Sequence, residues 1–146
     1  MVLDTAQLTK MSQAQLDELF SNSPAGNIPN GETSGIAIID PGTPLADIAA
    51  KFVHFFIWKG KVFDKESGQL RNEILPVGVK AIIAKVYYDK SWFDGKECIV
   101  LDYSQTSLIA HWIRDEIREI APGQYLGIVY WDKAKLINFV LDFPNT

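Results

Sequence analysis

The side chains most able to do chemistry gather in residues 107–127, SLIAHWIRDEIREIAPGQYLG. His111 and Asp115 suit acid–base work, or the anchoring of a polar group on a ligand. If the stretch is a strand, both lie on the face that also carries three isoleucines. They would then stand about 13 Å apart. Each would therefore need its own partner, because an unpaired buried charge is costly.

Further residues could complete a site around this pair. Tyr103 can donate its hydroxyl to a carboxylate or to a ligand, and Trp58 and Tyr88 could form aromatic walls. Arg114 falls on the opposite face under strict alternation, and a β-bulge would bring it inside. The predicted ligand-binding set is Trp58, Tyr88, Tyr103, His111, Arg114 and Asp115, with His111 and Asp115 as the catalytic candidates. The alternative for each of these side chains is an ordinary structural role in the core or at the surface.

Familiar cofactor and metal motifs are missing from the sequence. His54 and His111 are far apart, and neither has a second ligand at metal spacing. No phosphate-binding loop and no G-x-S-x-G nucleophile motif is present. Cys98, in ECIVLD, reads as a small buried apolar residue. We therefore expect no metal and no cofactor.

The secondary structure of residues 107–120 determines whether the charged side chains of this stretch face solvent or the interior. Apolar residues recur there at spacings of three and four, as on an amphipathic helix, which would leave the charges on a solvated face. Strand-rich segments precede and follow the stretch, however, and a helix would interrupt neighbouring strands. The context favours a strand, and the periodicity slightly favours a helix.

Composition fixes the general class of protein. The chain has 146 residues, a formal charge of −4 and 47% apolar residues, as expected for one globular domain. The acidic balance argues against nucleic acid as a partner. A single cysteine fits a reducing compartment, and the sequence shows neither a signal peptide nor an apolar run long enough for a membrane span. We expect a cytoplasmic protein.

The elements expected to position the site form one domain over residues 1–146. Residues 1–54 would hold a helix at 6–20, a strand at 34–40 and most of a second helix at 41–56. Residues 58–143 read as an antiparallel meander of about seven further strands separated by short turns. The predicted fold is mainly β: an antiparallel barrel of about eight strands with one or two N-terminal helices.

Alternation predicts which strand residues face inward. Ala84, Val86 and Tyr88 should face inward and Lys85 outward. In the last strand, the expected interior residues are Ile137, Phe139, Leu141 and Phe143. Around WKGKVF, the lysines should point out, which places Trp58, Gly60 and Val62 inside.

The sequence also resembles a known group of proteins. The segments LDELFSNSPAGNIPNGETSG, WKGKVFD, VLDYSQTS, IRDEIREIAPGQYLG and LINFVLDF occur in an order similar to that of small lipocalin-like or fatty-acid-binding-protein-like barrels. The layout is related to the GXWXG family, although GNIPNGETSG lacks that family's tryptophan. The resemblance implies a barrel with a strand at residues 109–120, and it implies no activity.

Two functions follow as hypotheses. One is binding of a small, mainly apolar or amphipathic molecule inside the barrel. The alternative is a cofactor-independent isomerase, cyclase or hydratase in which His111 or Asp115 moves a proton. Trp92 and Phe93, in the loop DKSWFDGK, could form a lid, a partner contact or a plug against the core. The sequence leaves open whether the chain forms a homodimer.

Overall fold

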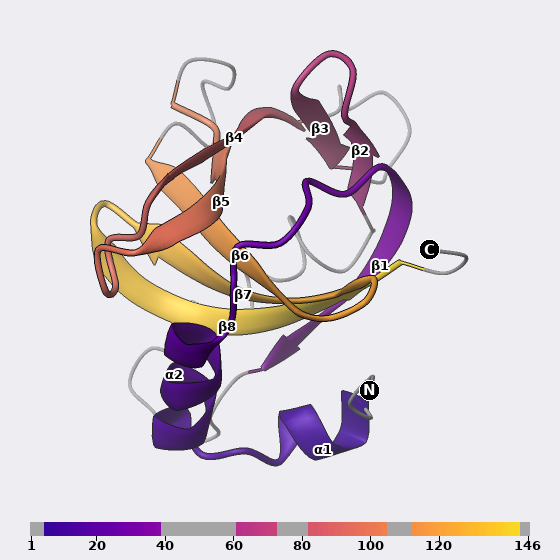
Figure 1. Cartoon of the computed structure of the whole chain (residues 1–146). Helices are drawn as coiled ribbons and strands as arrows, with labels where there is room; N and C mark the ends of the chain where they lie inside the picture. The colour runs from indigo at the N-terminus through magenta and orange to yellow at the C-terminus, as the bar shows by residue number, and fades with distance from the viewer. Residues whose placement is uncertain (1–4, 39–60, 73–81, 105–111, 144–146) are drawn as a thin grey trace.

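The computed structural model describes residues 5–38, 61–72, 82–104 and 112–143, and every structural statement below concerns these residues. Within them lie two short helices and eight strands (Figure 1). No helix in these ranges is long and apolar enough to cross a membrane.

Both helices lie near the N-terminus. They are α1 (Thr5–Thr9) and α2 (Gln13–Asn22), so the helix predicted at residues 6–20 is present but divided. The division falls at Ser12, whose hydroxyl accepts a hydrogen bond from the Gln15 amide while the Gln15 side chain accepts one from the Ser12 amide. This capping box satisfies amide groups that a helix start leaves unpaired. The second predicted helix, at residues 41–56, lies outside the described residues.

The strands confirm a mainly β, antiparallel fold. They are β1 (Gly31–Ile38), β2 (Lys61–Asp64), β3 (Gln69–Asn72), β4 (Ile82–Lys90), β5 (Glu97–Asp102), β6 (Ile113–Ala121), β7 (Gln124–Trp131) and β8 (Ala134–Asp142). Each strand pairs with the next one along the chain. The first three residues of β1 pair with β2 and the last five pair with β8. β1 thus links the first and last parts of the meander, and we call the eight paired strands the strand ring.

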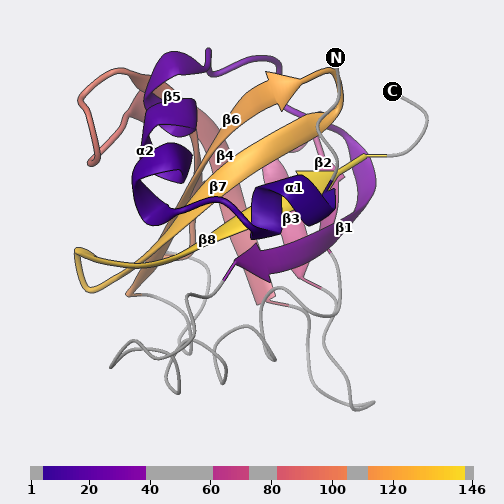
Figure 2. The same ribbon diagram turned by 90° about the horizontal axis from the view of Figure 1, so that it is seen from below.

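The two ends of the strand ring differ in what they carry. Because successive strands are antiparallel, the turns after β2, β4 and β6 all lie at the same end of the strand ring. We call this end the turn end. The turn between β7 and β8 lies at the other end, which we call the Trp131 end after the last residue of β7. β5 also finishes and β6 begins at the Trp131 end. Figure 2 shows the two helices against the outside of the strands.

Residues 113–121 form a strand, as the context of the sequence indicated. β6 pairs with β5 on one side and with β7 on the other, and most of its side chains are buried. The helical spacing of its apolar residues was misleading because Ile113 and Ile117 lie on the inner face, whereas Ile120 packs on the opposite side of the sheet. Residues 109–111 of the predicted strand lie outside the described residues.

Two apolar clusters stabilise the fold, one inside the strand ring and one outside it. The inner cluster contains Ala25, Phe63, Ala84, Val86, Ile99, Leu101, Tyr103, Ile113, Ile117, Tyr125, Val129, Ile137, Phe139, Leu141 and Phe143. The outer cluster joins the helices to β5, β7 and β8 and contains Leu8, Leu16, Phe20, Cys98, Val100, Leu126, Ile128, Tyr130 and Val140.

Alternation predicted the inner face correctly for β8 and most of β4, but not for β2. Ala84 and Val86 are buried in the inner cluster and Lys85 is exposed, as expected. In β2, Phe63 is in the inner cluster, opposite to the predicted parity. Its ring contacts Phe143 with centroids 5.4 Å apart. Burying a phenylalanine therefore decided the parity of this short strand, where the prediction had used the flanking lysines. Trp58 and Gly60 lie outside the described residues.

Candidate functional site

The inner face of β6 carries a carboxylate in apolar surroundings. Asp115 is only 2% exposed and alternates on this strand with Ile113 and Ile117, both in the inner cluster. Across the ladder it pairs with Val129 of β7 and Leu101 of β5, which are also inner-cluster residues. The prediction that Asp115 faces inward together with the isoleucines is therefore confirmed.

The other predicted site residues are dispersed. Tyr103 is fully buried in the inner cluster, just beyond the end of β5. Tyr88 is 42% exposed and donates its hydroxyl to the Gly26 carbonyl oxygen at 2.7 Å, at the turn end. His111 and Trp58 lie outside the described residues. The structure thus brings Asp115 and Tyr103 into one interior and places Tyr88 at its edge.

Arg114 lies on the outer face of β6. The irregularity in pairing between β6 and β7 falls between Glu119 and Ala121, so it does not turn Arg114 inward. The Arg114 guanidinium contacts the Glu116 carboxylate at 3.0 Å and donates to the Lys90 carbonyl oxygen at 2.8 Å. It also lies 4.3 Å from the centre of the Trp92 ring. Arg114 therefore belongs to an outer ionic network.

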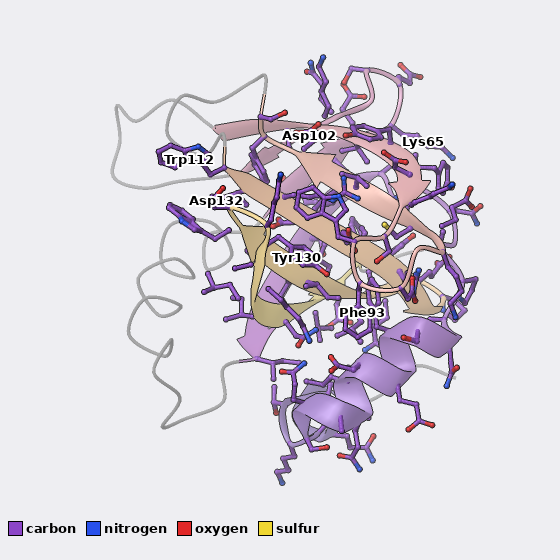
Figure 3. All side chains as sticks on the ribbon, turned by 90° about the vertical axis from the view of Figure 1, so that its left-hand side faces the viewer. Lys65, Phe93, Asp102, Trp112, Tyr130 and Asp132 are labelled. Carbon is purple, nitrogen blue, oxygen red and sulfur yellow. The ribbon has the colours of Figure 1, made fainter. Side chains whose placement is uncertain are left out.

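Glu116 holds the turn between β4 and β5 against this outer face. Its side chain is fully buried and accepts hydrogen bonds from the Ser91 hydroxyl at 2.6 Å and the Trp92 amide at 2.7 Å. Trp92 also contacts Tyr130, and Phe93 packs edge-on against Phe20 of α2. The loop that carries Trp92 and Phe93 therefore packs against the outer cluster (Figure 3).

Arg118 is the central group of the network. It is fully buried and donates to both Asp94 oxygens, at 2.6 and 2.7 Å. It also donates to the carbonyl oxygens of Phe20, Glu97 and Lys96. Five donated bonds match the full capacity of a guanidinium group, so Arg118 ties α2, the β4–β5 turn and β6 together.

This network is structural, and the hydrogen bonds from Arg118 are the largest cause of a lowered pKa at Asp94. The ion pair therefore persists to a pH below the usual titration range of a carboxylate. Sequence reasoning did not identify the network. The detectable signal is the alternation of Arg114, Glu116 and Arg118 on one strand face, which places opposite charges side by side.

Two other chemically capable groups have structural roles. Asp102 accepts the Tyr87 hydroxyl at 2.7 Å and the Ser104 amide at 2.9 Å. Cys98 is fully buried, as predicted, and burial, followed by the Glu116 charge, raises its pKa to about 12. Because the thiolate is the reactive form, these surroundings do not activate Cys98 as a nucleophile.

The described residues contain no candidate metal cluster. Among them, no group of three or more His, Cys, Asp and Glu residues could hold a metal ion. A hollow at the β2–β3 turn is lined by Asn30, Asp64, Lys65 and Glu66 and opens to solvent. All four of these lining residues are exposed, so the inner face with Asp115 remains the better candidate site.

The comparisons with known proteins bear on the fold and not on the activity. No protein-family model matches the sequence, and no curated protein matches it. A solved structure of a protein from Thermomonospora curvata is similar, with a TM-score of 0.57 and 14% sequence identity. The match covers 90% of this chain and 87% of that one. At this identity the likeness concerns the arrangement of elements and carries no activity.

Proposed function

We propose that the chain binds a small, mainly apolar molecule inside the strand ring, which acts as a lipocalin-like or fatty-acid-binding-protein-like barrel. The supporting observation is the almost complete burial of the Asp115 carboxylate among inner-cluster residues. A carboxylate is expensive to bury in such surroundings. Breaks of this kind in an otherwise consistent apolar pattern are expected at functional sites.

Asp115 and Tyr103 are the polar anchors in this proposal. A carboxylate accepts hydrogen bonds and a phenol both donates and accepts, so together they could orient a ligand with one polar group. The apolar body of the ligand would contact inner-cluster side chains such as Ile113 and Val129. This division between an apolar wall and a few polar groups is typical of small-molecule sites.

Replacement of Asp115 by leucine tests the anchor. We expect the variant to bind N-phenyl-1-naphthylamine, an apolar probe with one N–H donor, at least tenfold more weakly, as measured by fluorescence titration. Tenfold corresponds to about 1.4 kcal/mol, the size of one hydrogen bond to a charged acceptor. Circular dichroism and urea denaturation of the variant verify that it is folded under the assay conditions, so that a loss of affinity is not a consequence of unfolding.

Ile117→Leu is the matched control, because it changes shape without polarity on the same strand face. Its affinity should stay within threefold of the wild type. The proposal would be wrong if the wild-type protein shows no saturable binding to the probe and native mass spectrometry detects no co-purified small molecule. Equal losses of affinity in Asp115→Leu and Ile117→Leu would contradict the role of Asp115 as an anchor.

An acid–base enzyme acting on an apolar molecule is the second candidate. The observation that favours it is the presence of two ionisable groups, Asp115 and Tyr103, in one apolar interior. Asp115→Asn distinguishes binding from catalysis. If the chain is an enzyme, this variant should no longer convert a small molecule that co-purifies with the wild type, although it should still bind that molecule.

A further inference from the structure

Phe139 lies one row of paired residues away from Asp115, toward the turn end. Asp115 pairs with Val129 of β7, and Val129 pairs with Ile137 of β8. Two residues further along these strands, Gly127 pairs with Phe139. Successive residues on one face of a strand are about 7 Å apart, so Phe139 stands next to the row that carries the proposed anchor.

Gly127 lets the Phe139 ring extend from β8 onto β7. A Cβ at residue 127 would overlap the tip of this ring, including its Cζ atom. The ring therefore occupies the space on the inner face of β7 that a side chain at residue 127 would fill. Phe139 is fully buried in the inner cluster, so its ring covers parts of two strands in the interior beside the Asp115 row.

Three further aromatic side chains pack between this row and the turn end. Phe143, just after β8, contacts both Phe63 of β2 and Tyr125 of β7, with ring centroids 5.4 and 5.5 Å apart. Each of the three is at most 6% exposed and belongs to the inner cluster, as Phe139 does. Together these rings connect β2, β7 and the end of β8 across the interior.

The segment of residues 24–30 supports these rings from the turn end. It joins α2 to β1, and the Tyr125 hydroxyl donates to its Asn27 carbonyl oxygen at 2.5 Å. Ala25 of the same segment is buried in the inner cluster. The aromatic side chains behind Phe139 are thus held in place, and the Phe139 ring has little room to move toward the turn end.

The length of interior that remains beside Asp115 follows from β7 itself. This strand continues from Gly127 for four residues and ends at Trp131. At about 3.4 Å per residue, those residues line about 13 Å of the interior. A compact molecule of two fused or linked rings fits this length, whereas a long straight chain does not.

We propose that Phe139 is a specificity-determining residue whose ring forms the floor of the ligand site and restricts the protein to compact apolar ligands. This inference rests on the proposed function, because it sets the limit of that same interior site. A ligand that donates a hydrogen bond to Asp115 meets the Phe139 ring within one row of the sheet. The aromatic side chains behind the ring prevent it from yielding to a longer ligand.

Straight-chain primary alcohols from butanol to dodecanol test the floor, because each carries one hydroxyl donor for Asp115. Their dissociation constants are measured from the shift of the Ile113 methyl signal in isoleucine-labelled protein. Each methylene that becomes buried increases the affinity about fourfold. We therefore expect Phe139→Ala to bind dodecanol at least tenfold more tightly than the wild type does, and butanol within threefold of the wild type.

Phe143→Ala is the matched control, because it removes the same atoms from an inner-cluster ring that lies behind Phe139. Its affinity for every alcohol should stay within threefold of the wild type. Circular dichroism verifies that the variants are folded. If Phe139→Ala does not fold, Phe139→Leu replaces it, with an expected gain of at least threefold for dodecanol. Equal affinities for dodecanol in the wild type and the folded Phe139 variant would overturn the inference, although binding of the alcohols to the wild type would still support the proposed function.

The position of the bound alcohol gives a second readout. Leu141 lies one row beyond Phe139 on β8, toward the turn end, and is fully buried in the inner cluster. Nuclear Overhauser effects should connect the dodecanol chain to the Leu141 methyl groups in Phe139→Ala and not in the wild type. The same contacts in the wild type would overturn the inference. If dodecanol binds Phe139→Ala and no alcohol binds the wild type, the proposed function fails and the floor is supported, whereas both fail if no alcohol binds either protein.

Discussion

Replacing Arg118 with alanine is expected to lower the free energy of unfolding by about 3–5 kcal/mol, the range for breaking a buried ion pair from one side. The change removes five donated hydrogen bonds and leaves the Asp94 carboxylate, whose side chain is 13% exposed, without its main partner. It also removes the guanidinium stacked 4.4 Å from the Phe20 ring centre. Urea denaturation followed by circular dichroism measures the loss.

Lys96→Ala is the control for this result. Lys96 approaches the same Asp94 carboxylate at 4.0 Å, but its side chain is 62% exposed, so its loss should cost less than about 1 kcal/mol. Removing Asp94 as well, in Arg118→Ala/Asp94→Ala, should recover part of the stability, because the stranded carboxylate is gone. A loss below about 1 kcal/mol for Arg118→Ala would contradict the structural role of the network.

Replacing Gly127 with alanine is the second large effect that we expect, a loss of about 1–3 kcal/mol typical of overpacking. Gly127 lies in β7 opposite Phe139 of β8, and a Cβ at residue 127 would overlap the Phe139 ring. Phe139 is fully buried in the inner cluster, so its ring has little room to move aside. Urea denaturation of the variant measures the loss.

A double-mutant cycle isolates this contact. Phe139→Leu shortens the side chain, so Gly127→Ala should cost at least 1 kcal/mol less in that background than in the wild type. An outer-face change of similar size, Val140→Ala, provides a background in which the cost of Gly127→Ala should be unchanged. Equal costs in all three backgrounds would show that the ring does not occupy the space above Gly127.

Much of the strand content was predictable because alternation and turn residues are local properties of the sequence. The inward residues of β8 and the inward position of Asp115 follow from a period of two once the element is known to be a strand. For residues 113–121, periodicity alone did not predict the correct secondary structure. Their helical spacing arises because Ile113 and Ile117 lie on the inner face while Ile120 packs on the outer one, and only the neighbouring strands indicated the true structure.

The contacts that sequence reasoning missed depend on long-range partners. Arg118 bonds to Asp94 and to the Phe20 carbonyl oxygen, groups that the fold brings together from distant parts of the chain. Likewise, no local pattern shows that Tyr88 and Tyr125 meet the segment after α2. Tyr88 was predicted as an aromatic wall, whereas its described contact is with Gly26 at the turn end.

The most direct test of the central claim is to locate a bound ligand with methyl NMR of isoleucine-labelled protein. Addition of N-phenyl-1-naphthylamine should shift the methyl signals of the inner-cluster residues Ile99, Ile113, Ile117 and Ile137. The signal of Ile128, which belongs to the outer cluster, should stay in place. Saturable shifts confined to the inner isoleucines are the predicted result. Shifts at Ile128 with none at the inner isoleucines would contradict binding inside the strand ring.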